Sequence, residues 1–182
     1  MHKFLITVSF MFVCASTALA QGEEYPKFDF TAGYTLNFSD LRDNILLGHE
    51  TFNGFTVAAA GNINKKFGIE GDVTYTTKRL STTLPSVSGP RVNLFSYMGG
   101  PRFTARPENK KLQPFVHALF GGAHASVQTI KENGFAAKFG GGLDIVASKH
   151  VAVRMFQVDY YLTRFGGQNS NNVALTFGVR LF

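Results

Sequence analysis

Three polar side chains in the second half of the chain, His124, Ser126 and Glu132, are of the types that nucleophilic catalysis uses. A serine hydroxyl becomes a nucleophile when a neighbouring histidine takes its proton, and an acid orients that histidine. Because His124 and Ser126 are two residues apart, both point to one face if the segment is a strand. His-x-Ser pairs are common by chance, however, so we expect a histidine at a strand rim and an ordinary strand serine.

The other candidates for site chemistry are weaker. His49, His117 and His150 show no ligand spacing with a supporting carboxylate, so we expect no metal site. The glycine run from Gly140 to Gly142 is followed by no helical pattern, which excludes a dinucleotide-binding loop. Glycines inside strands more often mark bends or close packing. The sequence therefore predicts neither a cofactor nor a metal.

The elements that must position these residues are strands, because apolar and small polar residues alternate with a period of two. The alternation is blurred only in the fifth run, where Phe115 and Leu119 lie opposite Val116, Ala118 and Phe120. Eight such runs predict an all-β fold, an eight-stranded antiparallel up-and-down β-barrel that spans a membrane. They cover residues 28–38, 55–63, 69–76, 92–104, 113–126, 135–145, 156–162 and 172–182.

The connections between these runs are expected to alternate in length. Three are short, at residues 62–66, 105–112 and 147–150, and four are longer, at 39–51, 78–91, 127–134 and 163–171. Short turns at one rim and longer loops at the other are typical of transmembrane barrels.

The polar face of the strands indicates which side faces lipid. It carries mostly Gly, Ala, Thr, Ser and Asn with isolated charges, which suits the narrow interior of an eight-stranded barrel. Charges confined there must pair or stay hydrated, so we predict a lumenal network of ion pairs and waters. Its members are Asp29, Glu70, Asp72, Arg102, Lys138, Asp144, Asp159 and Arg180. Arg154 falls on the lipid side by its parity. Either its side chain snorkels toward the membrane surface or a bulge changes the face on which it lies.

The outward face carries large apolar residues, with aromatics toward the strand ends as in an interfacial girdle. These aromatics are Phe28, Phe38, Phe67, Tyr75, Phe103, Tyr161 and Phe165. Basic residues gather at both expected rims, where they could contact lipid phosphates or lipopolysaccharide, or simply aid solubility. The short-turn rim holds Lys65, Lys66, Arg106, Lys110, Lys111 and Lys149, and the long-loop rim holds Lys78, Arg79, Arg91 and Arg164.

The final strand ends on an aromatic residue, which predicts that this strand is an assembly signal. Because it is half apolar, the strand must pair on both of its edges. One face carries Val173, Leu175, Phe177, Val179 and Leu181. Phe182 has the parity of the opposite face, which it shares with Arg180.

The N-terminus has the layout of a cleaved secretory signal peptide at residues 1–20. A basic start at Lys3 is followed by an apolar run too short to span a bilayer and by the small-residue site before Gln21. Cys14, the only cysteine, lies inside this run behind bulky residues, which argues against lipid attachment. Residues 21–182 are then one outer-membrane barrel domain, free of disulfides and exported, so nucleic-acid binding is not expected.

Several segments resemble the small OmpA/OmpX-like outer-membrane β-barrel domains often called porin-family proteins. They are FDFTAGYTLNF, GFTVAAAGNINKKFGIEGDVTY, GGPRF, FGGGLD, MFQVDYYLTRF and the aromatic C-terminus. The resemblance covers residues 25–182 and implies an outer-membrane location in a diderm bacterium. It also implies handling by periplasmic chaperones and by the barrel assembly machinery. The inward parity of Phe182 departs from the family pattern.

The expected function is that of a non-enzymatic outer-membrane barrel, structural, adhesive or a narrow pore, with a polar lumen filled by side chains. A closed barrel of this size needs no partner, so a monomer is expected. The lipid A deacylases, also eight-stranded outer-membrane barrels, use a His-x-Ser pair with an acid, but that acid would fall near Lys138 here. The other alternative is a soluble periplasmic barrel with its apolar face turned inward around a ligand.

Overall fold

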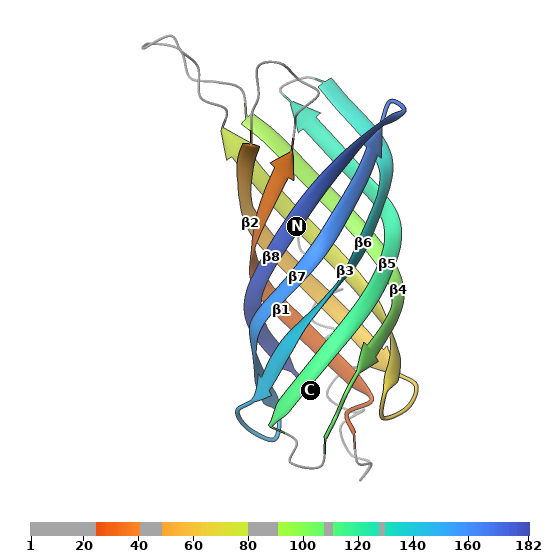
Figure 1. Ribbon diagram of the computed structural model, residues 1–182, viewed down its shortest axis with the longest axis vertical. Helices are drawn as coiled ribbons and strands as arrows, with labels where there is room; N and C mark the ends of the chain where they lie inside the picture. Colours follow the sequence, from red (N-terminus) through yellow and green to blue (C-terminus); the bar gives the residue numbers. More distant parts are fainter. Residues whose placement is uncertain (1–24, 41–48, 80–90, 108–110, 128–129) are drawn as a thin grey trace, which may run out of the picture.

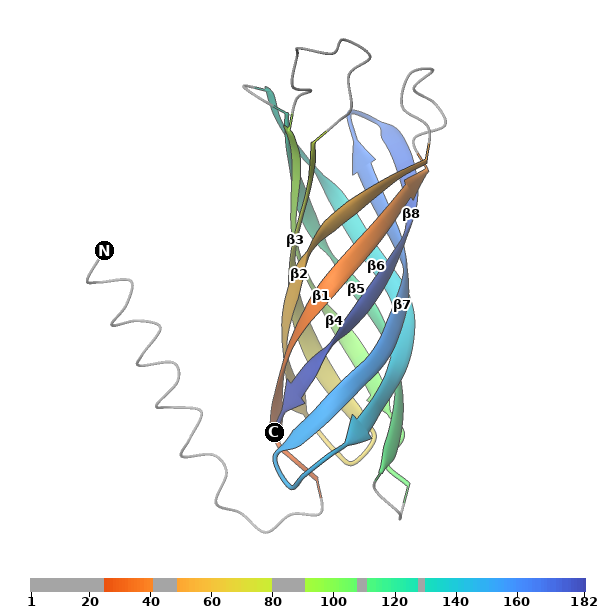
Figure 2. The ribbon, with the colours of Figure 1, turned by 90° about the vertical axis from the view of Figure 1, so that its left-hand side faces the viewer.

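The computed structural model describes residues 25–40, 49–79, 91–107, 111–127 and 130–182. The described chain forms one closed antiparallel β-barrel of eight strands (Figures 1 and 2). The strands are β1 (Phe28–Asp40), β2 (His49–Asn62), β3 (Phe67–Arg79), β4 (Arg91–Thr104), β5 (Leu112–Val127), β6 (Ile130–Val146), β7 (Val151–Phe165) and β8 (Gln168–Leu181). None of the described residues forms a helix long and apolar enough to cross a bilayer.

Each strand pairs with its sequence neighbour, and β8 pairs with β1 to close the barrel. The closing register runs from Phe30 opposite Leu181 to Ser39 opposite Asn172. Closure leaves no strand edge unpaired, which is the condition for placing strands in hydrocarbon. The predicted eight-stranded up-and-down transmembrane barrel is confirmed.

The connections differ from the prediction at one end of the barrel. The three short ones, at residues 63–66, 105–111 and 147–150, define what we call the turn end. The opposite end, the loop end, has the predicted longer connections at 41–48 and 80–90, which lie outside the described residues, as does the predicted signal peptide.

Two connections predicted to be long are short. Residues 128–129 alone separate β5 from β6, and Gly166–Gly167 alone separate β7 from β8. Both glycines have positive φ, 54° and 86°, as a two-residue hairpin turn requires. The polar residues on either side, such as Asn169 and Asn171, belong to paired strands rather than to a loop.

The two faces of the barrel have opposite chemistry. Phe30, Tyr97 and Val116 are about half exposed on the outside, whereas all eight charged residues predicted for the lumen are buried. The outward apolar face is the one a bilayer requires, and a soluble barrel wrapped around a ligand would show the reverse arrangement.

A bulge in β7 resets the alternation. Met155 and Phe156 both face outward, and the register with β8 shifts between Arg154 and Gln157. Arg154 is therefore buried inside the barrel and not on the lipid side as its parity suggested, which confirms the bulge interpretation. Tyr161 and Phe165, both predicted for the aromatic girdle, are also inside: Tyr161 is almost fully buried, and Phe165 packs against the buried lumenal cluster.

Candidate functional site

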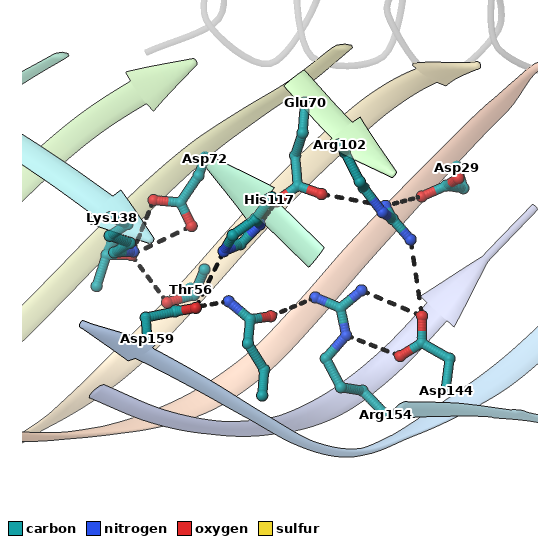
Figure 3. A network of polar contacts seen from close by, with 12 residues as sticks. Asp29, Thr56, Glu70, Asp72, Arg102, His117, Lys138, Asp144, Arg154 and Asp159 are labelled. Carbon is teal, nitrogen blue, oxygen red and sulfur yellow. Dashed lines mark hydrogen bonds and ion pairs between the residues drawn. The ribbon is translucent and has the colours of Figure 1, made fainter. Parts of the chain in front are cut away.

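The candidate site is a closed ring of side chains that cross the lumen (Figure 3). We call it the lumenal ring, and in order around the ring its members are Arg102, Glu70, His117, Asp159, Gln157, Arg154 and Asp144. They come from β3, β4, β5, β6 and β7, so contacts between distant strands hold the walls together from within.

Arg102 is the branching point of the ring. Its Nη1 donates to Asp29 Oδ1 at 2.9 Å and to Glu70 Oε2 at 3.1 Å. Its Nη2 lies 3.7 Å from Asp144 Oδ2. Asp29 in turn accepts a hydrogen bond from the Asn62 amide at 2.9 Å. One buried guanidinium thus joins carboxylates of β1, β3 and β6.

His117 bridges two carboxylates on opposite walls of the barrel. Its Nδ1 lies 2.9 Å from Glu70 Oε1 on β3, and its Nε2 lies 3.0 Å from Asp159 Oδ1 on β7. A neutral imidazole has only one N–H. Both contacts are hydrogen bonds to carboxylates only if both ring nitrogens carry protons, so the geometry fits an imidazolium.

The remaining side of the ring depends on the β7 bulge. Gln157 donates to Asp159 Oδ2 at 2.7 Å and accepts from Arg154 Nη1 at 2.5 Å. Arg154 also donates through Nε and Nη2 to the two oxygens of Asp144, at 2.9 and 3.2 Å. Two parallel bonds of this kind are the strongest arginine–carboxylate arrangement.

Two further cations complete the network. Arg180 on β8 lies 3.1 Å from Asp144 Oδ2 and hydrogen-bonds Gln113 Oε1. Lys138 on β6 donates to Asp72 Oδ1 at 2.8 Å and to Thr74 Oγ1 at 2.7 Å. The eight predicted lumenal residues therefore form two groups inside the barrel: the ring with Asp29 and Arg180, and the Lys138–Asp72 pair with its threonines.

The charges buried in the described part of the chain balance when His117 is an imidazolium. Five buried carboxylates face the three arginines, one lysine and His117. An unpaired buried charge costs several kcal/mol, so this balance explains how the barrel tolerates so many ionised groups away from bulk water.

A chain of threonine hydroxyls lines the wall beside Lys138. Thr176, Thr35, Thr56 and Thr74 follow one another from β8 through β1 and β2 to β3, with Oγ1–Oγ1 distances of 2.9, 2.7 and 2.8 Å. Thr74 Oγ1 then donates to Asp72 Oδ1 at 3.2 Å. The chain links the closing strands β8 and β1 to the ion pairs of β3 and β6.

The half of the lumen nearer the loop end holds an apolar cluster together with small polar side chains. Met98, Leu119 and Tyr161 pack there with small residues of three strands. The cluster consists of Leu94, Met98, Leu119, Ala123, Ala136, Tyr161, Phe165 and Ala174. The polar residues buried in the same half include Asn37, Thr76, Ser96, Thr163 and Asn172. The Lys138 Nζ lies 5.4 Å from the centre of the Tyr161 ring, at the edge of the cluster.

The candidate catalytic residues are not brought together. Ser126 stands opposite Lys131 and His124 opposite Asn133, on the outward face, whereas Glu132 stands opposite Ala125 on the other face. His124 Nδ1 instead donates to Asn133 Oδ1 at 2.6 Å. The arrangement assembles no Ser–His–acid triad from these three residues. Among the residues described, no cluster of three or more His, Cys, Asp or Glu side chains is arranged to hold a metal ion.

Four members of the network were missed from the sequence, namely Gln113, His117, Arg154 and Gln157. His117 shares the parity of Phe115 and Leu119, which are both buried inside the barrel. The blurred alternation of β5 was therefore the sequence feature that indicated a lumenal position for His117. Arg154 could be placed only with the bulge known.

Contacts at the turn end close this side of the barrel. Arg106 donates to the Lys65 carbonyl oxygen at 2.5 Å and to Asn62 Oδ1 at 3.1 Å. Partial burial lowers the pKa of its guanidinium from the ordinary value. The Phe182 N–H donates to the His150 carbonyl at 3.0 Å, and the Arg180 guanidinium lies 5.0 Å from the Phe182 ring centre. The final aromatic is thus ordered on the lumenal side, with the parity read from the sequence.

Comparison with known proteins places the barrel among small outer-membrane barrels. Neisserial surface protein A (NspA) superposes with a TM-score of 0.65 at 15% identity, covering 85% of this chain and 96% of NspA. OprG of Pseudomonas aeruginosa gives 0.53 at 10% identity, covering 85% and 94%. Ail, the attachment invasion locus protein of Yersinia pestis, gives 0.50 at 16% identity, covering 84% and 97%. At these identities the likeness concerns the fold.

A search of curated proteins finds no match. The family model for the outer membrane protein beta-barrel domain matches residues 5–181, nearly the whole sequence. The chain belongs to the outer membrane protein β-barrel domain family.

Proposed function

We propose that this protein is a structural, non-conducting barrel of the outer membrane, with no enzymatic role. The observation that supports this is the filled lumen. Side chains of the lumenal ring join opposite walls at the turn-end half, and an apolar cluster with small polar side chains occupies the loop-end half. An eight-stranded barrel has an interior just wide enough for side chains to fill.

The two halves block ions for different reasons. In the ring, an ion would have to displace the partner of a paired charge, and that displacement would leave a buried charge unpaired. In the cluster around Met98 and Leu119 an ion would lose its hydration with few polar atoms to replace the water. A narrow pore is therefore the less favoured function, and the separation of Glu132 from His124 and Ser126 gives no support to lipid hydrolysis.

Planar-bilayer recording tests the proposal. The refolded protein should give no steady open channel at moderate voltages. The variant Met98→Ser/Leu119→Ser, which makes the cluster polar, is the matched comparison for detecting brief openings. Large, steady channels from the unaltered protein would overturn the proposal.

The location of the protein in the outer membrane is also a proposal. We infer export through the N-terminal signal, insertion by the barrel assembly machinery with periplasmic chaperones, and a monomeric state. Fractionation should recover the protein in the outer membrane with a shortened N-terminus, and boiled and unboiled samples should differ in gel mobility. Recovery in the osmotic-shock fluid would contradict the location.

A further inference from the structure

The carboxylates whose side chains the structure describes all lie on the lumenal side of the barrel wall. The five buried carboxylates all face the lumen, and Glu132 stands in lumenal register opposite Ala125. The charged side chains described on the outward face near the loop end, Arg91, Lys131 and Arg164, are all cationic and exposed. They lie on β4, β6 and β7, next to the apolar belt of the wall.

The positions of these cations place them at the edge of that belt. Ser126 pairs with Lys131, and Phe135, an exposed outward aromatic, pairs with Arg164. Arg91 is four residues beyond the exposed Phe95 on the same outward face of β4. Aromatic residues at a strand end mark the level of the lipid headgroups, so the three cations sit where headgroup phosphates lie.

Three asparagines on the outward face, Asn93 on β4, Asn133 on β6 and Asn171 on β8, have amide oxygens that accept hydrogen bonds from neighbours. The amide oxygen of Asn93 accepts from Tyr75 at 3.0 Å and from Thr77 at 2.8 Å. The oxygens of Asn133 and Asn171 accept from His124 at 2.6 Å and from Tyr160 at 2.8 Å. Because each oxygen is occupied by a neighbour, the amide NH₂ group is the part left to contact a ligand.

The donors and cations together favour an anion. Arginine and lysine with amide N–H groups match phosphate oxygens, which accept several hydrogen bonds at once. The outward residues described near the loop end of β1, β2 and β8, namely Phe38, Thr51, Asn53, Asn169 and Asn171, include no cation. The outward cations that the structure describes at this end are therefore on β4, β6 and β7, with Asn171 of β8 next to them.

We infer that this surface, the cationic band of Arg91, Lys131 and Arg164 with Asn93, Asn133 and Asn171, binds the phosphate groups of a phosphorylated glycolipid in the outer leaflet. The inference rests on the proposed placement of the barrel in the outer membrane. The acyl chains of the lipid lie against the apolar wall below the band, and its phosphates contact the guanidinium, ammonium and amide groups.

The test is retention of bisphosphorylated lipid A by the refolded barrel in detergent, measured by native mass spectrometry. The band variant is R91Q/K131Q/R164Q. The control is K66Q/K111Q/K149Q, which removes the same charge from exposed lysines at the turn end. The unboiled gel mobility of each variant establishes that it is folded.

We expect the band variant to bind lipid A about tenfold more weakly or worse, and the control to change by less than about twofold, because each exposed ion pair contributes only modestly. Dephosphorylated lipid A should bind the unaltered protein as weakly as lipid A binds the band variant. Equal retention by the band variant and the unaltered protein would overturn the inference, as would equal loss in the control.

These outcomes are distinct from failure of the proposed function. A protein that conducts ions but retains lipid A through the band refutes the closed lumen and leaves the lipid surface intact. A closed barrel that binds lipid A and dephosphorylated lipid A equally well refutes phosphate binding by the band and leaves the closed lumen intact.

Discussion

The Lys138–Asp72 ion pair offers a direct test of whether the lumen is as dry as its side-chain packing implies. The two groups are 2.8 Å apart and almost fully buried. At that distance, Coulomb attraction is about 6 kcal/mol for an effective dielectric constant of 20. Desolvation of both ions offsets much of this, and measured costs of breaking one buried pair are about 3–5 kcal/mol.

Lys138→Met removes the charge and keeps a long apolar side chain against the Tyr161 ring. Asp72 then keeps only its contact with Thr74. We expect the free energy of unfolding to fall by about 3–5 kcal/mol. The double variant Lys138→Met/Asp72→Leu removes both charges, and it should recover to within about 1.5 kcal/mol of the unaltered protein, because replacing a whole buried pair by apolar groups is often neutral.

The assay is urea unfolding of the barrel in lipid vesicles, followed by the gel mobility of unboiled samples. Gel mobility is preferable to fluorescence because the chain has no tryptophan. A loss below about 1 kcal/mol for Lys138→Met, typical of an exposed pair, would show that water screens the pair and would refute the filled lumen. A double variant as unstable as the single one would refute the attribution to an unpaired Asp72.

Three further predictions use the same assay, urea unfolding followed by the gel mobility of unboiled samples. Deleting Met155 removes the extra residue and leaves Arg154, Phe156 and Gln157 in strict alternation with Arg154 still inside, so the folded fraction should be largely kept, and a sharp drop would contradict the one-residue bulge. Gly140→Ala should destabilise by about 1–3 kcal/mol, since its Cβ would lie 2.2 Å from Asp159 Oδ1, whereas Gly71→Ala, with nothing within 4 Å, should be neutral; equal effects would refute the packing argument. His117→Phe should cost about 3 kcal/mol by removing two charged hydrogen bonds, while His124→Phe on the outward face should stay within about 0.5 kcal/mol; similar losses would count against the imidazolium bridge.

The barrel could be predicted from the sequence because a period of two is a local property. Every run except the fifth shows its apolar and polar faces within about ten residues, and the small, sparsely charged polar face indicates an interior. The eight predicted lumenal charges follow from parity alone. Their pairing does not, because it depends on the register between strands that are far apart in the sequence.

The errors have local physical causes. Arg154 was assigned by counting, and a single extra residue at Met155–Phe156 reverses the count. Gly166–Gly167 is a two-residue hairpin signal, but the polar run after it gave the impression of a long loop. The sequence marks the apolar cluster only by Leu119 on the lumenal face of β5, because the residues that surround it come from distant strands.

The threonine chain has a fixed direction along its whole length. Each hydroxyl owns one proton, and that of Thr74 goes to Asp72, which as a carboxylate can only accept. Thr56 must then donate to Thr74, Thr35 to Thr56 and Thr176 to Thr35, so a single carboxylate sets the polarity of hydroxyls on four strands. The seam that joins the first and last strands is therefore oriented by an acid two strands away, and replacing Asp72 would let these dipoles reverse without moving any heavy atom.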